Sequence, residues 1–413
     1  MVETKDIERD SASPAGLSTP PAGDGTAPLP ATVVRLGWVS FLTDVSGEMI
    51  FPLIPAFLAG ISGAPASALG WIEGVADATA STLKIVSGRL TDRAAKKKPL
   101  VLFGYGISSF VRPLVCFAAS WPVVLGVRFL DRVGKGVRSA PRDTLIAAAA
   151  PPGRRGAAFG LHRAFDNAGA VLGPLVATAL ILWFGASFRT VFALSAIPAV
   201  LSVVVLVFGV KEAPSPASGD LKTATLAPLP VSFRRAVGVM ALFTLSASSD
   251  GFLLLKAREC GVSAGWLPVL WSGVNAIRAA FSLWGGGLSD RFGRKVLLGL
   301  AWLLYAGCYA AFASVTTIAG VSAVLAVYAM FGALSEGTER ALIADLVPPE
   351  SRGRAFGWMH GLTGFSALIA SVAFGSLWDR FGSRTAFLVG AAPAALAALA
   401  LVFFIPSKAS AKA

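Results

Sequence analysis

The sequence predicts an all-α polytopic membrane protein whose twelve transmembrane helices form two pseudo-symmetric six-helix halves. The first observation is composition: of 413 residues, 55% are hydrophobic and only 14% are charged, whereas soluble proteins carry about 25% charged residues. The second is the recurrence of apolar runs of membrane-spanning length from about Val33 to Phe404. Most of these runs lack the polar face that a soluble helix needs. The third is a sequence repeat between the two halves of the chain.

Twelve apolar segments divide the chain, and a polar stretch rich in Pro and Ser separates the sixth from the seventh. Such a stretch is typical of a linker. We therefore expect a disordered tail over 1–30, a first half over 31–212, a linker over 213–231, a second half over 232–407 and a tail over 408–413. The segments are 33–60, 65–88, 99–119, 121–149, 156–183, 189–210, 232–257, 264–287, 296–317, 319–346, 354–377 and 385–406.

Basic residues gather in the connections that follow the even-numbered segments. This pattern predicts that those connections and both termini lie on the cytoplasmic side of a bacterial cytoplasmic (inner) membrane. The formal net charge of +13 arises largely there, so we expect no nucleic-acid partner. The three cysteines Cys116, Cys260 and Cys308 have no partner spacing, which argues against a disulfide or metal framework. We expect no metal and no cofactor.

The two halves repeat a short motif. The residues from Pro151 to Gly160 match those from Pro348 to Gly357 at an offset of 197, and Asp92-Arg93 falls on Asp290-Arg291 at an offset of 198. A parallel repeat of six helices places a transport site between the halves, near the bilayer midplane.

Several motifs resemble those of the major facilitator superfamily. Gly286-Gly-Leu-Ser-Asp290-Arg291-Phe-Gly293-Arg294 resembles its signature loop, and the first-half copy keeps Gly88, Asp92 and Arg93. The stretch from Arg128 to Gly136 resembles the fourth-helix motif, with Asp131 where glutamine is more usual. Gly169-Ala-Val-Leu-Gly173-Pro174 is similar to the fifth-helix motif of the family's antiporters, without the trailing glycine pair. The resemblance implies the twelve-helix fold of that superfamily and alternating access.

The aspartate of each signature loop can pair with an arginine or a helix N-terminus in one conformation and lose that partner in another. This is what a gate requires; the alternative is a turn whose basic residues only set topology. The predicted gating residues are Gly88, Asp92, Arg93, Arg138, Arg142, Gly286, Asp290, Arg291, Gly293 and Arg294. Gly169 and Gly173, one helical turn apart, are predicted to allow close helix packing, and Pro174 to bend the helix.

A stripe of cations runs along the fourth segment. Residues 128, 132, 135, 138 and 142 fall within about a third of the circumference of a helix. We expect Arg128, Arg132 and Lys135, with Asp131, to bind substrate, because arginine side chains one turn apart suit an anionic or zwitterionic solute. Two alternatives stay open: nearby acids neutralise the stripe, or the charges form internal ion pairs that only fix helix packing.

Ionisable side chains, most of them acidic, lie at one-turn spacing on three other segments. Carboxylates in an apolar interior are the side chains best suited to carry a proton through a transport cycle. The predicted proton-coupling residues are Asp44, Glu48, Glu73, Asp77, His162 and Asp166.

These observations together predict a proton-coupled secondary transporter of a small organic solute rather than an enzyme. Its expected partners are a small-molecule substrate, protons and the lipid bilayer, and we expect it to be a monomer. The alternatives are a drug/proton antiporter that exports neutral or cationic compounds, and a non-transporting membrane sensor with the same fold. No nucleotide-binding Walker motif is present in the sequence, which disfavours an ATP-driven pump.

Overall fold

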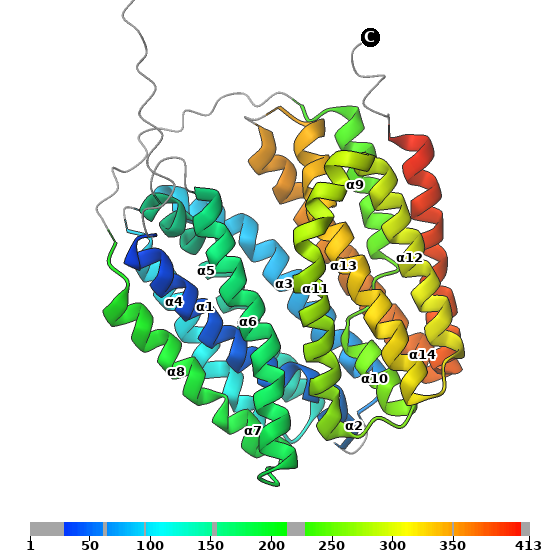
Figure 1. Cartoon of the computed structure of the whole chain (residues 1–413), viewed down its shortest axis with the longest axis horizontal. Helices are drawn as coiled ribbons and strands as arrows, with labels where there is room; N and C mark the ends of the chain where they lie inside the picture. Colours follow the sequence, from blue (N-terminus) through cyan, green and yellow to red (C-terminus); the bar gives the residue numbers. More distant parts are fainter. Residues whose placement is uncertain are drawn as a thin grey trace, which may run out of the picture.

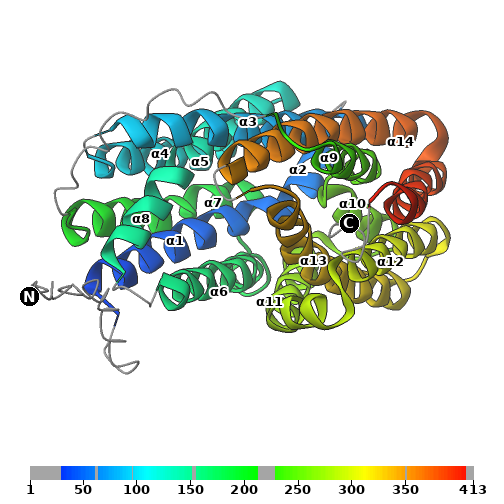
Figure 2. The ribbon, with the colours of Figure 1, turned by 90° about the horizontal axis from the view of Figure 1, so that it is seen from above.

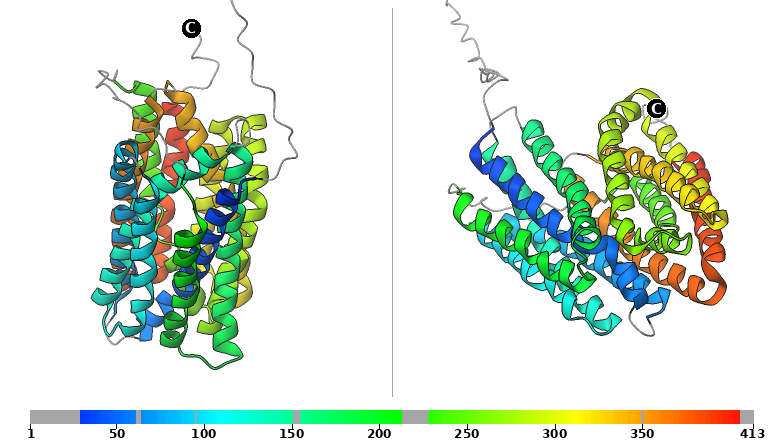
Figure 3. Two further views of the ribbon diagram at one scale, coloured as in Figure 1. Left: turned by 90° about the vertical axis from the view of Figure 1, so that its left-hand side faces the viewer. Right: turned by 60° about the horizontal axis from the view of Figure 1, so that its bottom comes forward.

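The protein is described by a computed structural model over residues 29–60, 64–94, 96–150, 155–212, 228–348 and 351–405. Throughout these residues the regular structure is helical. The helices form two groups that stand side by side (Figure 1). Figure 2 and the right view of Figure 3 show the same division from other directions. The fold class predicted from the sequence is confirmed. The expected tails and most of the expected linker lie outside the described residues.

The helices of the first group coincide with the first six expected segments, and those of the second group with the last six. The first group comprises α1 (Ala31–Ile50), η1 (Phe51–Leu53), α2 (Ile54–Gly60), α3 (Ala66–Arg93), α4 (Lys98–Val111), η2 (Arg112–Phe117), α5 (Trp121–Ala149), α6 (Arg155–Leu182), α7 (Phe188–Leu194), α8 (Ala196–Val204) and η3 (Val205–Gly209). The second comprises α9 (Val231–Thr244), α10 (Gly251–Glu259), η4 (Ala264–Trp266), α11 (Leu267–Phe292), α12 (Arg294–Ser314), α13 (Ile318–Leu346) and α14 (Arg352–Phe404).

Several membrane segments are interrupted helices. The first segment changes from α1 through η1 to α2 at Pro52 and Pro55, because proline removes a backbone donor and clashes with the preceding turn. The last two expected segments run together as α14, which is kinked at Gly382 where φ is +80°. A backbone with that φ favours glycine, since a side chain would be strained there.

Seven spans of the described chain are long and apolar enough to cross a membrane by length and composition. The last of these spans, Arg354–Phe404, contains two of the expected segments. Neither α3 nor α5 is among the seven. Charged and small polar residues lower the hydropathy of both helices, and these two helices carry much of the candidate site.

The two groups are in contact along α3 and α14, from Ser67 opposite Gly375 to Ile85 opposite Gly361, and also between α6 and α11. We call the end of the molecule opposite the start of α1 and the end of α14 the far end (Figure 1). The first part of α14 runs alongside α3 (Figure 2). A Cβ on Gly70 would overlap the carbonyl oxygen of Ser371, and one on Gly375 would lie 2.6 Å from the Cα of Ser67. Glycine therefore permits these two helices to pack backbone against backbone.

Hydrogen bonds also join the groups at the far end. The Asp379 carboxylate on α14 accepts from the backbone N–H groups of Ala66, at 2.7 Å, and Ser67, at 2.9 Å, at the start of α3. Both N–H groups lie in the first turn of a helix, where they lack partners within the helix and favour a negative charge. Between α6 and η4 of the second group, the Thr178 hydroxyl donates to the carbonyl of Gly265.

Asp379→Asn is expected to lower the population of the closed far end about fivefold, because an amide loses the charge-assisted part of the contact, about 1 kcal/mol for an exposed group. The measurement is double electron–electron resonance between spin labels on the exposed far-end residues Phe184 and Phe381. Glu259→Gln is the matched control, because Glu259 pairs with Lys256 on its own helix. An unchanged distance distribution for Asp379→Asn would show that the contact does not hold this end closed.

Candidate functional site

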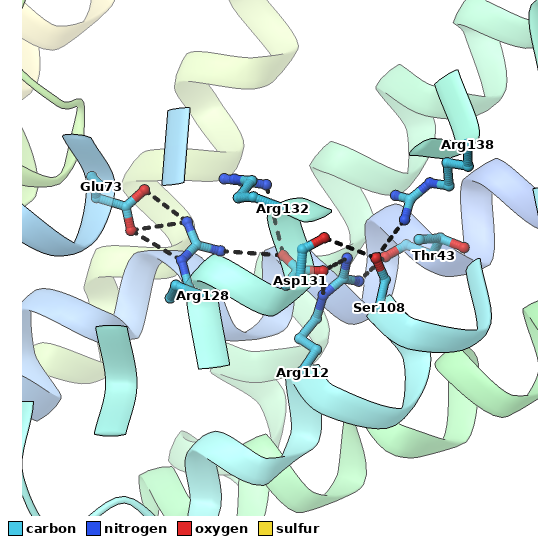
Figure 4. A network of polar contacts seen from close by, with 8 residues as sticks. All are labelled: Thr43, Glu73, Ser108, Arg112, Arg128, Asp131, Arg132 and Arg138. Carbon is cyan, nitrogen blue, oxygen red and sulfur yellow. Dashed lines mark hydrogen bonds and ion pairs between the residues drawn. The ribbon is translucent and has the colours of Figure 1, made fainter. Parts of the chain in front are cut away.

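Charged side chains of the fourth segment meet partners from three other elements inside the first group. We call the following ten residues the first-half charge cluster: Asp44 and Glu48 on α1, Glu73 and Asp77 on α3, Arg112 on η2, and Arg128, Asp131, Arg132, Lys135 and Arg138 on α5. Figure 4 shows the inner part of this cluster. The sequence placed nine of the ten in candidate roles, and the tertiary structure adds Arg112.

One buried ion pair joins α3 to α5. Arg128 donates through Nη2 to both carboxylate oxygens of Glu73, at 2.7 and 2.8 Å, and through Nε at 3.1 Å. Both side chains are buried. Helices α3 and α5 approach closely at Gly136. A Cβ built on this glycine would lie only 2.5 Å from the Cβ of Leu83. A buried, doubly bonded pair of this kind holds two helices in register.

A second buried pair centres on Asp131. Arg112 donates to its Oδ1 through Nη2 at 2.8 Å and through Nε at 3.2 Å. A further N–H of the same guanidinium, Nη1, donates to the Thr43 carbonyl at 2.7 Å, so that Arg112 ties α5 to α1. Sequence reasoning missed Arg112. The available signal was that it is the only charged residue in the interior of its apolar segment.

Asp131 is shared among several cations. Its Oδ2 lies 3.8 Å from nitrogen atoms of both Arg128 and Arg132. Nearby, Arg138 donates to the Ser108 hydroxyl at 2.6 Å and stacks over the Tyr105 ring, 4.3 Å from its centroid. Arg138 was predicted to act in a gate; the structure places it, buried, among these helices (Figure 4).

The remaining members of the cluster keep exposed surface. Asp77 and Lys135 are exposed, and Asp44, Glu48 and Arg132 are half-buried. Lys135 interacts electrostatically with Asp44 and Arg132, and Asp77 interacts with Arg132. The cluster therefore has a buried layer of bonded ion pairs and an outer layer whose charges are accessible.

Three predicted residues pair outside the cluster. His162 and Asp166 on α6 form an i,i+4 contact, with Nδ1 and Oδ2 3.5 Å apart. Arg142 contacts the carboxylate of its neighbour Asp143 at 2.9 Å. On the same helix α6, Gly169 and Gly173 pack on α1, where a Cβ on either would lie 2.7 Å from a backbone oxygen. Pro174 lies inside α6.

The predicted signature loops are only partly described. The side chains of Asp92, Arg93, Asp290 and Arg291 and the surroundings of Gly286 lie outside the described part of the structure, so their gating role stays a prediction. Gly293 ends α11 with φ of +87°, the left-handed region that favours glycine. Arg294 pairs with Asp345 of α13 at 2.8 Å. Gly88 has open space around the position of a Cβ.

One contact links the cluster to the second group. The indole N–H of Trp271 on α11 donates to Oε2 of Glu48 at 2.8 Å, and the ring of Phe51 lies 5.2 Å from that of Trp271. Arg128 in turn lies over Phe51, 5.7 Å from the ring centroid. An acid of the first-half charge cluster is thus in direct contact with the opposite group of helices.

Two helical groups that stand side by side, with ionisable residues buried in apolar segments, define a polytopic membrane protein of the transporter type. The model of the Major Facilitator Superfamily matches residues 36–277 and 261–413. The chain belongs to this superfamily of membrane transporters.

Named relatives and solved structures agree with that assignment. An uncharacterised MFS-type transporter of Methanocaldococcus jannaschii is 32% identical over 382 residues, covering 91% of this chain and 95% of that protein. A probable actinorhodin transporter of Streptomyces coelicolor is 29% identical, covering 83% of this chain and 58% of that protein. The crystal structure of a POT family transporter in complex with 5-aminolevulinic acid superimposes with a TM-score of 0.75 at 14% identity, covering 91% of this chain and 96% of that chain.

Proposed function

We propose that this transporter moves a small anionic or zwitterionic organic solute across the cytoplasmic membrane together with protons, by alternating access. The observation that carries the proposal is the charge balance of the first-half charge cluster. Five cations, namely Arg112, Arg128, Arg132, Lys135 and Arg138, stand against five acids, namely Asp44, Glu48, Glu73, Asp77 and Asp131.

A balanced set of charges in apolar surroundings resists a change in its net charge, because an uncompensated charge there costs several kcal/mol. An anionic solute that enters adds one negative charge, and one proton taken up by an acid restores the balance. Solute and proton then favour each other's binding, which is the requirement for using one gradient to drive another. The acids with exposed surface, Asp44, Glu48 and Asp77, are the proposed proton carriers.

The division of the cluster assigns different roles to the predicted substrate residues. Arg132 and Lys135, which keep exposed surface, are the proposed substrate contacts. Arg128 and Asp131, which are bonded and buried, act by positioning α5 against its neighbours. On the proposed topology, with the basic connections on the cytoplasmic side, the far end faces outwards.

The experiment is proton flux in proteoliposomes that contain the purified protein and a trapped pH dye. Imposing a gradient of a transported carboxylate is expected to move protons in the same direction as the carboxylate. Lys135→Gln should reduce that flux at least about tenfold, since the loss of a charged contact is worth 1.5–3 kcal/mol. Lys98→Gln is the control, because Lys98 bonds to the carbonyl of Val207, away from the cluster.

The same assay tests the alternatives. A drug/proton antiporter is the second candidate, favoured by the likeness to a probable actinorhodin transporter. The charge balance of the first-half charge cluster also favours it, because a cation that enters the cluster would expel a proton. Proton movement opposite to a cationic or neutral solute would establish that candidate and overturn the first. Absence of flux across a panel of anionic, neutral and cationic solutes would favour a membrane sensor.

A further inference from the structure

A second ion pair lies at a break in a membrane segment of the second group. Helix α9 ends at Thr244 and α10 begins at Gly251, and Asp250 stands directly before α10. Backbone groups at such a break need partners inside a membrane. The Tyr305 hydroxyl donates to the carbonyl of Ser246 at 3.1 Å, so the break is supported by side chains of the neighbouring helix α12.

The Asp250 carboxylate holds an arginine in an end-on contact. Both terminal nitrogens of Arg278 on α11 donate to the single oxygen Oδ2, each at 3.2 Å, while Oδ1 accepts the Tyr328 hydroxyl at 2.6 Å. A carboxylate that uses both of its oxygens makes two parallel bonds to a guanidinium, which is the stronger arrangement. Asp250 is therefore a weaker partner for Arg278 than a carboxylate free to align with it.

Aromatic rings orient the Arg278 head group. Its guanidinium carbon lies 5.3 Å from the centroid of Trp271 and 5.5 Å from that of Tyr328. Trp271 is the residue that donates to Glu48 of the first group. The arginine thus lies over the tryptophan through which the second group contacts Glu48 of the first-half charge cluster.

Exposure separates this pair from the buried pairs of the cluster. The side chains of Arg278 and Asp250 are 28% and 26% exposed, whereas those of Arg128 and Glu73 are 5% and 3% exposed. Arg278 therefore keeps surface on which another molecule can make contact, whereas Arg128 is enclosed by its neighbours.

We propose that Arg278 is the carboxylate-binding residue of the second group and that a small organic carboxylate binds there by replacing Asp250. The inference rests on the proposed transport of an anionic solute and names its chemical class. Asp250 acts as an internal competitor that occupies the arginine when substrate is absent, and Tyr328 keeps the released carboxylate hydrogen-bonded.

Because Asp250 and the substrate compete for Arg278, replacing Asp250 and replacing Arg278 should change carboxylate affinity in opposite directions. Arg278→Gln is expected to weaken carboxylate binding at least about tenfold, and Asp250→Asn to tighten it about tenfold, since each charge-assisted contact is worth about that factor. If the pair only fixed helix packing, both changes would weaken binding and lower the unfolding temperature together.

The experiment measures binding to the purified protein by calorimetry, with benzoate and nicotinate as probes and benzamide and nicotinamide as neutral counterparts. Arg35→Gln is the matched control, because Arg35 on α1 bonds to the Gly209 carbonyl within the first group. Arg278→Lys and Asp250→Ala provide second variants if either first one unfolds. Selective binding of the carboxylates, with opposite shifts in the two variants, is the expected result.

Either of two binding results overturns the inference. One is failure of the wild-type protein to bind the carboxylates in preference to the amides, and the other is weaker binding in both Asp250 variants. Flux measurements in proteoliposomes distinguish failure of the inference from failure of the proposed function. If the Arg278→Gln variant still moves solute together with protons, the transport proposal stands and the inference is removed. Loss of flux for every solute in the wild-type protein would remove the transport proposal itself.

Discussion

Arg128→Met is expected to lower the free energy of unfolding by about 3–5 kcal/mol, because removal of one partner leaves the buried Glu73 carboxylate uncompensated. The measurement is unfolding of the purified protein in mixed detergent micelles, followed by circular dichroism. Lys135→Met, a change of an exposed cation on the same helix, is the control and should cost less than about 1 kcal/mol.

The double variant Arg128→Met with Glu73→Leu sharpens this test. Replacing both members of a buried pair with apolar residues removes the uncompensated charge, so the double variant is expected to regain most of the lost stability. Equal losses in the single and double variants would mean that the pair itself, rather than the orphaned charge, supplies the stability. Loss of substrate binding in Arg128→Met alone would not show a substrate contact, and Arg132 is the better position to test.

Gly70→Val is expected to abolish transport, because the added side chain would overlap the Ser371 carbonyl on α14 and keep the far end from closing. Alternating access requires that each end close in turn around one site. The far-end spin labels on residues 184 and 381 should then report only long distances. Transport is measured as exchange of labelled solute in proteoliposomes.

Gly106→Val is the matched control. Apart from its chain neighbours and the adjoining backbone of its own helix, no atom lies within 4 Å of a Cβ built at Gly106. The control variant is expected to transport at the wild-type rate, with the wild-type distance distribution. Retention of transport by Gly70→Val would contradict the requirement for backbone contact between α3 and α14 at this end.

Local sequence features predicted the helical spans because hydropathy acts over one segment at a time. The expected segment 121–149 and helix α5 share the same bounds. Segments that break inside the membrane were harder to predict. The seventh, expected as one run over 232–257, is divided into α9 and α10, because tertiary partners such as Tyr305 satisfy the backbone at the break.

The sequence also predicted which residues bring charge into the membrane, but it did not predict their partners. Arg128 and Arg132 are one turn apart and looked equivalent. In the structure one is bonded to Glu73 and buried, while the other keeps exposed surface. The sequence did not identify Arg112 as a site residue, because its role depends on contacts with Asp131 and Thr43, which lie on other helices.

By itself the sequence determined the membrane class, the helical spans and the motifs of the superfamily, because each of these depends on residues close together in the chain. Only the tertiary structure decided which charges are bonded and which are accessible. The reason is that an ion pair or hydrogen bond depends on distance in space: Glu48 and Trp271, separated by 223 positions, lie 2.8 Å apart. The accessible pair of Asp250 and Arg278 became a candidate site for the same reason, once its end-on geometry and exposure could be seen.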